Sequence, residues 1–460
     1  MMRDLGLAEV ARFLGVARPA RDVVFNGVST DSRTITPGQL FVALSGERFD
    51  GHAFVDEAGQ RGAAALLCSR EIESHLPCLQ VADTLLALGQ VALLNRQLFR
   101  GTLIALTGSA GKTTTKEMIA AILGCRADVL ATRGNLNNEI GVPLTLLGLT
   151  PAIRYAVIEM GAARPGDIRY LTGLAEPDVA LLTNAMPAHL EGFGSIEAVA
   201  ATKGEIYDAL PVTGTAVLNI DDRFAAGWQA RIGSRRVVRV SASGAADADV
   251  RASNVQIADG CAQFGLEMSG EQITIRLQVP GVQQVANAVA AAGVACAMGI
   301  PARQVKEGLE SLHPVAGRME RMNSPGGCLL INDTYNANPG SMRAAIETLA
   351  TFSGTRVLVM GHMAELGAGA GRLHHEAGVC AREHAIEHLL VIGAHAEAVA
   401  EGYGAGARVF AGRDALSAAC AAFDQPGVVM LVKGSRSAGM EAVVAVLLGS
   451  AARNTLAEVH

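Results

Sequence analysis

A glycine-rich turn stands between an apolar run and a helix-like segment, and it restricts the possible folds more than any other feature. The run is residues 103–107, Leu-Ile-Ala-Leu-Thr, and residues 113–123 carry apolar side chains at helical spacing before Gly124. The turn reads Gly-Ser-Ala-Gly-Lys-Thr over residues 108–113. Glycines in such a turn let backbone N–H groups close on phosphate oxygens, and the helix N-terminus adds a favourable dipole. This segment therefore predicts a parallel sheet with a phosphate loop at its edge.

The phosphate loop predicts ATP as its ligand. Lys112 is expected to reach the terminal phosphates, and Thr113 is expected to offer its hydroxyl to magnesium. The general pattern has a further leading glycine where this chain has Leu106, so the match is shorter than the full signature. A glycine-rich turn without a ligand is the alternative, but the Lys-Thr pair and both flanking segments favour the nucleotide. The residues expected to bind it are Gly108, Ser109, Ala110, Gly111, Lys112, Thr113 and Thr114.

Buried-strand patterns that alternate with helical patterns recur in two blocks. The strand-like runs are residues 103–107, 155–160, 179–183 and 215–220 in the first block and 329–332, 356–360, 389–392 and 428–432 in the second. Each block predicts a doubly wound domain in which helices cover a parallel sheet. Residues 249–279 alternate in short runs broken by Asp259-Gly260 and Ser269-Gly270, which predicts antiparallel hairpins within the central domain.

The whole chain is expected to be an α/β protein of three domains, because 460 residues exceed what one hydrophobic core usually organises. Residues 1–82 contain short apolar runs and turn clusters and predict a small N-terminal α/β domain. Residues 83–313 are expected to form a central domain with the parallel sheet of a P-loop ATPase. Residues 314–460 are expected to form a Rossmann-like C-terminal domain, with a hinge near His313-Pro314.

The composition argues against several classes of partner. A net charge of −6 and an aromatic content of 4% do not suit nucleic-acid binding, so no nucleic acid is expected. No stretch approaches the ~20 apolar residues of a membrane span, and no apolar run follows the amino-terminal charges, so no membrane insertion is expected. The eight cysteines lack metal-ligand or redox spacing and are interpreted as reduced thiols. The expected location is the cytoplasm.

Three further polar residues follow predicted strands of the first block, where open parallel sheets bind ligands. Glu159 ends one strand, and a carboxylate there can hold magnesium. A solvated or helix-capping glutamate is the alternative. His189 and Lys203 follow the next strand, and each taken alone is interpreted as a surface histidine or a solvated lysine.

Several ordered motifs resemble those of the Mur ligase family, whose members build the peptide of bacterial peptidoglycan. They are residues 107–114 (Thr-Gly-Ser-Ala-Gly-Lys-Thr-Thr), 134–143 (Gly-Asn-Leu-Asn-Asn-Glu-Ile-Gly-Val-Pro), 159–161 (Glu-Met-Gly) and 188–193 (Ala-His-Leu-Glu-Gly-Phe). The resemblance covers essentially the whole chain. It implies an ATP-dependent ligase that activates a carboxylate as an acyl phosphate and joins it to an amine.

Residues 332–339, Asn-Asp-Thr-Tyr-Asn-Ala-Asn-Pro, are most similar to the family members that add D-alanyl-D-alanine to UDP-N-acetylmuramoyl-tripeptide. Residues 432–437, 31–33 and 46–52 are similar as well, and the Asp-Asn-Pro-Arg sequence usual in a sister ligase is not found. If residues 335–339 are only a turn, the dipeptide is recognised elsewhere. Two other functions stay open, namely a nucleotide-binding scaffold without catalysis and a sister ligase with another amine substrate.

The resemblance also implies roles for single residues. In the family the lysine at the place of Lys203 is carbamylated, and together with His189 it would hold a second magnesium ion. Thr113 and Glu159 would hold the first. Catalytic roles fall on Lys112, His189, Lys203 and Asp333, and further nucleotide contacts on Asn287 and Arg318.

Each domain would bind one substrate, the first the UDP-sugar, the central one ATP and the last the incoming amine. The residues matched to substrate contacts are Ser29, Asp31, Ser32 and Arg33 for the uridine diphosphate, Asn137 and Asn138 in the second motif, and Asn336 and Asn338 for the dipeptide. The protein is expected to act as a monomer.

A few positions depart from what the family usually shows. They are Ala110, Ala163, Gln283-Gln284 and His362. None of them replaces a residue with an implied catalytic or metal role, so activity is expected. The lost polar partners cost ~1 kcal/mol or more each and put the adenine-side contacts and the loop's hydrogen bonds in doubt, so the affinity for nucleotide is expected to be altered.

Overall fold

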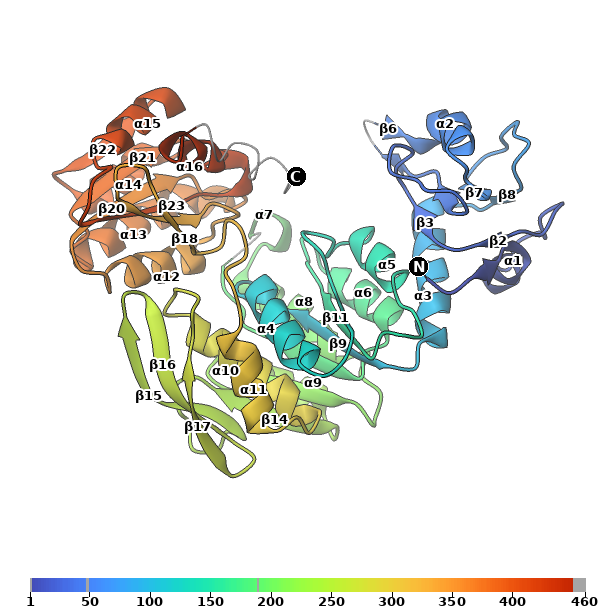
Figure 1. The fold of residues 1–460 in the computed structure, drawn as a ribbon, viewed down its shortest axis with the longest axis horizontal. Coiled ribbons are helices and arrows are strands. Elements are labelled where there is room, and N and C mark those ends of the chain that lie inside the picture. The colour runs from blue at the N-terminus through green and yellow to red at the C-terminus, as the bar shows by residue number, and fades with distance from the viewer. Residues whose placement is uncertain (1, 47–48, 188–189, 450–460) are drawn as a thin grey trace.

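Three α/β domains follow one another along the chain in a computed structural model that describes residues 2–46, 49–187 and 190–449 (Figure 1). The N-terminal and C-terminal domains lie on opposite sides of the central domain in this view. The three-domain α/β fold expected from the sequence is confirmed. The boundaries at 82/83 and 313/314 remain predictions, and they fall between Gln80 and Thr84 and between Glu310 and Glu320, where one domain's last element ends and the next element begins.

The N-terminal domain is built on a small parallel sheet with the strand order β3-β4-β7-β8. Its strands are β3 (Val28–Ser29), β4 (Leu40–Val42), β7 (Ala65–Cys68) and β8 (Cys78–Gln80), with the short pairs β1 (Leu5–Gly6) with β2 (Val24–Phe25) and β5 (Ser45–Gly46) with β6 (Phe49–Asp50). Its helices are α1 (Leu7–Leu14), η1 (Gly51–Phe54) and α2 (Val55–Gln60). Strands β4 and β7 are buried throughout, which makes them the centre of this core.

The central domain contains a nine-stranded sheet with the order β10-β11-β9-β12-β13-β14-β15-β16-β17. The parallel strands are β9 (Thr102–Thr107), β10 (Val129–Ala131), β11 (Tyr155–Glu159), β12 (Val179–Leu182), β13 (Thr215–Asn219), β14 (Arg236–Ser241) and β15 (Val250–Ala258). Strands β16 (Cys261–Met268) and β17 (Glu271–Arg276) continue the sheet as antiparallel hairpins that turn at Asp259-Gly260 and Ser269-Gly270. The predicted hairpins are therefore confirmed.

Helices cover both faces of this sheet. They are α3 (Thr84–Leu98), α4 (Lys112–Gly124), α5 (Gly141–Leu146), α6 (Asp167–Ala175), α7 (Leu190–Phe193), α8 (Ile196–Gly204), η2 (Glu205–Tyr207), α9 (Ala225–Ile232), α10 (Gln284–Ala297) and α11 (Ala302–Glu310). Successive strand residues point to opposite faces, so Leu103 and Ala105 enter the core under α3, α5 and α6, while Ile104 and Leu106 enter the core under α4, α10 and α11. Helix α3 also packs against the N-terminal domain, because its buried side chains belong to the same hydrophobic core as Leu7 and Val10 of α1.

The C-terminal domain has a six-stranded sheet with the order β18-β19-β23-β20-β21-β22. Its strands are β18 (Glu320–Asn323), β19 (Leu329–Asp333), β20 (Thr355–Gly361), β21 (His388–Ile392), β22 (Ala407–Phe410) and β23 (Val428–Lys433), and only β18 is antiparallel to its neighbour. Its helices are α12 (Pro339–Leu349), η3 (Gly367–Gly369), α13 (Ala370–Glu383), α14 (Ala396–Tyr403), α15 (Arg413–Ala421), η4 (Arg436–Ala438) and α16 (Glu441–Leu447).

The strand order of the central sheet positions the site. Strand β9 pairs with β11 and β12, so the carboxyl ends of these three strands, and the loops that follow them, lie side by side at one edge of the central sheet. Within the described part of the chain, no helix combines the length and the apolar character needed to cross a membrane.

Candidate active site

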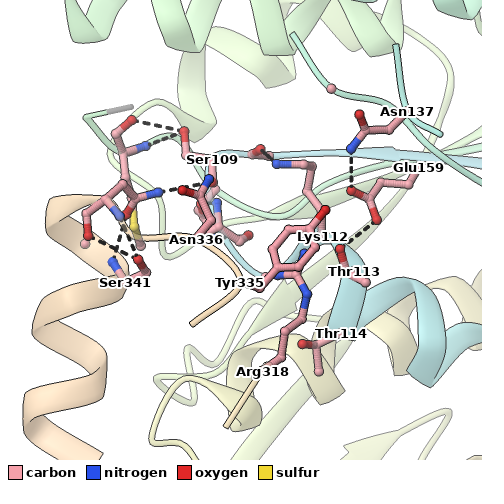
Figure 2. A pocket seen from close by; sticks show the side chains of 18 of the residues that line it. Ser109, Lys112, Thr113, Thr114, Asn137, Glu159, Arg318, Tyr335, Asn336 and Ser341 are labelled. Carbon is pink, nitrogen blue, oxygen red and sulfur yellow. Dashed lines mark hydrogen bonds between the residues drawn. The ribbon is translucent and has the colours of Figure 1, made fainter. Parts of the chain in front are cut away.

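A cavity of about 600 Å³ opens at this sheet edge, between the central and C-terminal domains. Its central wall consists of the lining residues between Gly108 and Asn287, and its C-terminal wall consists of the lining residues between Arg318 and Ala344 together with Lys433. Figure 2 shows side chains of both walls pointing toward one another. The cavity therefore joins two segments that are far apart in the sequence.

The phosphate loop, residues 108–113, is part of the central wall of the cavity. Gly108 and Gly111 have φ angles of +156° and +79°, and a Cβ on Gly108 would collide with the Thr183 hydroxyl, so only glycine fits there without strain. Asn184 fastens the loop, because its Oδ1 accepts the Ala110 N–H at 3.0 Å and its backbone oxygen accepts the Ser109 N–H at 3.0 Å. The loop is thus held rigidly at the N-terminus of α4.

Lys112 begins α4 and lies inside the cavity. Its Nζ donates to the Gly108 carbonyl at 2.9 Å. Burial lowers the pKa of this ammonium, Glu159 works against that shift, and the positive charge of Arg318 adds to it. The residue is therefore a half-buried cation whose position suits a phosphate ligand.

Glu159 ends β11 and is buried, with 2% of its surface exposed. The Thr113 hydroxyl donates to its Oε2 at 2.9 Å, and the Asn137 amide donates to its Oε1 at 2.9 Å (Figure 2). The solvated or capping glutamate considered above is therefore not what the structure has. A carboxylate beside a hydroxyl is a hard oxygen pair that suits Mg²⁺ when phosphate oxygens complete the coordination. The described residues contain no cluster of three or more His, Cys, Asp or Glu that would hold a metal alone.

Lys203 lies near the end of α8 and also lines the cavity. It is buried, with 2% of its surface exposed, so the interpretation as a solvated lysine is wrong. Burial lowers its pKa well below the usual range, the charge of Lys112 lowers it further, and Asp167 opposes both. Its predicted companion His189 lies outside the described residues.

The C-terminal wall carries Arg318, Asp333, Tyr335, Asn336 and Asn338. Asn338 caps α12, because its Oδ1 accepts the Ser341 N–H at 2.8 Å, and its Nδ2 donates across the domain boundary to the Ser109 carbonyl at 3.4 Å. Residues 335–338 therefore line the cavity and lead directly into α12, whose first residue is Pro339.

The structure does not bring every predicted residue to this cavity. Asn287, Thr114, Asn137 and Asn138 line it, but Ser29, Asp31, Ser32 and Arg33 lie in and after β3 of the N-terminal domain. There, the Arg33 Nη2 lies 2.7 Å from the Asp31 Oδ2, and this contact lowers the pKa of the Asp31 carboxyl. The Ser32 hydroxyl donates to the Glu57 Oε2 at 2.8 Å. This group forms a separate polar cluster, in which Ser29 and Ser32 are buried.

Several lining residues received no role from the sequence, among them Asn184, Met186, Tyr170 and Lys433. Asn184 follows β12 and Lys433 ends β23, so the same rule that pointed to Glu159, a polar residue at the carboxyl end of a parallel strand, could have found both. Met186 and Tyr170 carry no comparable signal in the sequence.

The departures from the family pattern fall at different distances from the cavity. Ala110, Ala163, Gln283 and Gln284 line it, and the Gln284 Oε1 accepts the Asn287 amide at 2.8 Å. Gln283 has a buried side-chain oxygen without a partner among the described residues. His362 is not a lining residue, and its Nε2 lies 3.1 Å from the Ser437 hydroxyl.

Comparisons with known proteins agree along the length of the chain. Three family models match, described as "Mur ligase family, catalytic domain" over residues 24–92, "Mur ligase middle domain" over residues 106–295 and "Mur ligase, glutamate ligase domain" over residues 317–436. The UDP-N-acetylmuramoyl-tripeptide--D-alanyl-D-alanine ligase of Escherichia coli (strain K12) is 44% identical over 97% of this chain and 99% of its own length.

Solved structures of MurF are also similar to this chain over most of its length. A crystal structure of MurF from Acinetobacter baumannii superposes with a TM-score of 0.91 at 34% identity, covering 97% of this chain and 99% of that one. MurF ligase from Thermotoga maritima in complex with ADP superposes with a TM-score of 0.81 at 30% identity, covering 91% and 96%.

Proposed function

The chain belongs to the Mur ligase family, and from this premise we propose that it adds D-alanyl-D-alanine to UDP-N-acetylmuramoyl-tripeptide at the expense of ATP. The product is the UDP-N-acetylmuramoyl-pentapeptide of cytoplasmic peptidoglycan synthesis. The observation that carries the proposal is the cavity in which the phosphate loop, the buried Glu159 and Lys203, and residues 333–338 face one another.

The reaction needs activation because a carboxylate oxygen is a poor leaving group. A carboxylate oxygen of the tripeptide attacks the γ-phosphorus of ATP, the bond to the β-phosphate oxygen breaks, and an acyl phosphate and ADP result. The amine of D-alanyl-D-alanine then attacks the acyl carbon, loses a proton, and the tetrahedral intermediate expels phosphate. The first step brings two anions together, and the second builds negative charge on the acyl oxygen and on the departing phosphate, so the site must supply fixed positive charge.

Lys112 is the residue of this chain that would supply that charge. Its half-buried ammonium stands at the helix N-terminus where the phosphates would bind, and its partial desolvation strengthens its attraction for them. Thr113 and Glu159 would hold magnesium, which when bound neutralises charge on the phosphates. Asn137 orients the Glu159 carboxylate for that task.

Lys203 is proposed to be carbamylated. Its amine is buried close to the cation Lys112, and the lowered pKa favours the neutral amine, which is the form that adds CO₂ with loss of a proton. The resulting carbamate carries a negative charge, so it attracts the neighbouring cation Lys112, whereas a protonated Lys203 would repel it. Together with His189, this carbamate would hold a second magnesium ion.

The remaining roles follow the family. We propose that the N-terminal domain, residues 1–82, binds the uridine diphosphate through the group around Asp31, that residues 83–313 bind ATP, and that residues 314–460 bind the dipeptide near Asn336 and Asn338. Asp333 would face the ribose or the reacting centre. We propose that the protein works in the cytoplasm as a monomer.

Product analysis tests the reaction against its two alternatives. Phosphate release is expected only when both UDP-N-acetylmuramoyl-tripeptide and D-alanyl-D-alanine are present with ATP, and mass spectrometry should find the pentapeptide nucleotide. ATP binding without turnover would favour a non-catalytic scaffold. Turnover with single amino acids in place of the dipeptide would favour a sister ligase. Assays with tripeptides that end in lysine or in diaminopimelate identify the accepted third residue.

A variant tests the role of Lys203. Lys203→Ala is expected to lose turnover about a hundred-fold or more, as removal of a preorganised charged group typically does. In the wild type, turnover should fall in CO₂-depleted buffer and return with bicarbonate. It should also fall as the pH drops through the lowered pKa, because the protonated amine cannot add CO₂. Unchanged turnover of the variant would contradict the carbamate.

A further inference from the structure

Lys433 is a buried cation that none of the roles above uses. It is the last residue of β23, only 2% of its surface is exposed, and it lines the cavity. In the sheet it stands opposite Asp333, the last residue of β19. Its Nζ donates to the Asp333 Oδ2 at 2.6 Å and to the Asn336 carbonyl at 2.9 Å. One ammonium therefore fastens both ends of the short segment that leaves β19.

Asp333 also contacts the segment that contains Arg318. Its second oxygen, Oδ1, accepts the Met319 N–H at 3.2 Å. On the other side of Arg318, the Gly317 carbonyl accepts the Tyr335 N–H at 3.1 Å. Arg318 is thus held between two bonds to the segment that Lys433 fixes, and a shift of that segment moves the arginine.

The Arg318 side chain reaches the phosphate loop across the face of Tyr335. Its guanidinium carbon lies 3.9 Å from the centre of that ring, which is the geometry of a cation–π contact. Figure 2 shows the two side chains stacked beside Thr114 and close to Lys112. The Arg318 Nε is buried and has no hydrogen-bond partner within the described parts of the chain. A buried donor in that state is suited to an acceptor oxygen of a ligand.

We propose that Lys433 is a positioning residue for the nucleotide, which acts through Asp333 to set Arg318 and Tyr335 against the phosphate loop. Lys433 neutralises Asp333, whose carboxylate would otherwise stand as an unpaired anion on a wall that faces phosphates. It also holds the Asn336 carbonyl, which fixes the turn from which Tyr335 projects. The inference rests on the proposed function in one respect, that the ligand of the phosphate loop is an adenine nucleotide.

A double-mutant cycle on nucleotide binding tests the proposal. The dissociation constant of ADP with magnesium is measured by calorimetry for the wild type, Lys433→Met, Arg318→Ala and the double variant. Lys433→Met is expected to weaken ADP about ten- to a hundred-fold, the usual effect of losing a charged hydrogen bond. If Lys433 acts through Arg318, the second substitution adds little to the first, because both disrupt the same positioning of Arg318. The dissociation constant of ADP for the double variant should then be at most about twofold higher than that of whichever single variant binds ADP more weakly.

Two results would overturn the proposal. One is wild-type ADP affinity in Lys433→Met, and the other is losses that multiply in the double variant, since a merely structural lysine would act independently of Arg318. Lys306→Met is the matched control, because Lys306 also joins a carboxylate, at 3.1 Å, and a backbone carbonyl, at 2.6 Å, but does so outside the cavity. It should leave ADP affinity unchanged.

Two further measurements keep the test decisive. If Lys433→Met unfolds, the double variant Asp333→Asn/Lys433→Met removes both charges and avoids an unpaired buried carboxylate. That variant should bind ADP about tenfold more weakly than Asp333→Asn alone, because the bond from Lys433 to Asn336 is lost while the change at Asp333 is common to both. Wild-type affinity in it would also contradict the proposal. Failure of the wild type to form pentapeptide would reject the proposed reaction but leave the ADP cycle interpretable.

Discussion

The central wall and the C-terminal wall of the cavity differ in what holds their residues in place. On the central wall, Lys112 and Thr113 of α4 and Glu159 of β11 belong to one domain and are bonded to one another or to the loop itself. On the C-terminal wall, the residues are bonded among themselves and reach the central domain through few contacts, such as the Asn338 amide on the Ser109 carbonyl. The first wall is fixed by the fold of one domain, and the second by how two domains dock.

A second contact between the domains lies at the other end of α12. The hairpin turn Asp259-Gly260 reaches the C-terminal domain, where the Gly260 N–H donates to the Thr351 hydroxyl at 3.0 Å and Arg321 donates to the Asp259 carbonyl. The N-terminus of α12 touches the phosphate loop while residues just past its C-terminus touch this hairpin. The comparison therefore predicts that damage to the central wall abolishes chemistry, whereas damage to the docking contacts weakens binding of the last substrate.

The largest effect is expected from Lys112→Met on the central wall. Turnover, measured as phosphate release with all three substrates, should fall about a thousand-fold or more, because a preorganised cation at the transferring phosphate is lost. The thermal unfolding temperature should not fall. The folded state lowers the pKa of Lys112, so at neutral pH the charged side chain costs stability that methionine does not. Turnover within tenfold of wild type would contradict the prediction that damage to the central wall abolishes chemistry.

The two walls also differ in how far the sequence predicts them. The central wall could be predicted because the strand, the glycine turn and the helix are contiguous, and because Glu159 ends a recognisable strand. The antiparallel edge strand β18 and the pairing of Lys433 with Asp333 could not, since these partners lie 100 residues apart and meet only once β23 has inserted between β19 and β20. Local periodicity identifies the strands but not their order in the sheet.

The same limit applies to the docking of the domains. The sequence predicted the Asp259-Gly260 turn from its residues, but nothing in that pattern says that the turn meets Thr351. The burial of Lys203 was not predicted either, because a lysine on a short helix reads as solvated until the surrounding domain is known. Residue roles that depend on contacts between domains therefore needed the three-dimensional structure or a resemblance to a family.

An intermediate effect is expected from the hairpin contact. Gly260→Ala places a Cβ at a φ of +74° and against the Phe352 ring, so it should loosen the docking of the C-terminal domain. The KM for D-alanyl-D-alanine should rise about three- to tenfold, in line with the loss of ~1 kcal/mol in a positioning contact, while ADP affinity changes little.

Gly270→Ala is the matched control for that variant. Gly270 has a φ of +79° in the next hairpin turn, and a Cβ there meets nothing within 4 Å, so it carries the same backbone strain without the contact. It should leave the KM for the dipeptide unchanged. Equal KM values for the two variants would mean that the hairpin does not position the C-terminal wall. The contact of the hairpin with the C-terminal domain would then have no part in the difference between the two walls.

The smallest effect is expected at Ala110, where the family usually has asparagine. The backbone of Ala110 is already held from both sides, because its N–H donates to Asn184 and its carbonyl accepts the Thr183 hydroxyl at 2.8 Å and the Asn184 amide at 3.1 Å. Ala110→Asn should therefore change the KM for ATP less than about threefold, since no unpaired backbone group awaits a partner. Asn184→Ala, which removes two of these bonds, should raise that KM about tenfold or more. If Ala110→Asn instead lowers the KM tenfold, the loop lacks a partner that Asn184 does not supply, and the central wall is less complete than its hydrogen bonds indicate.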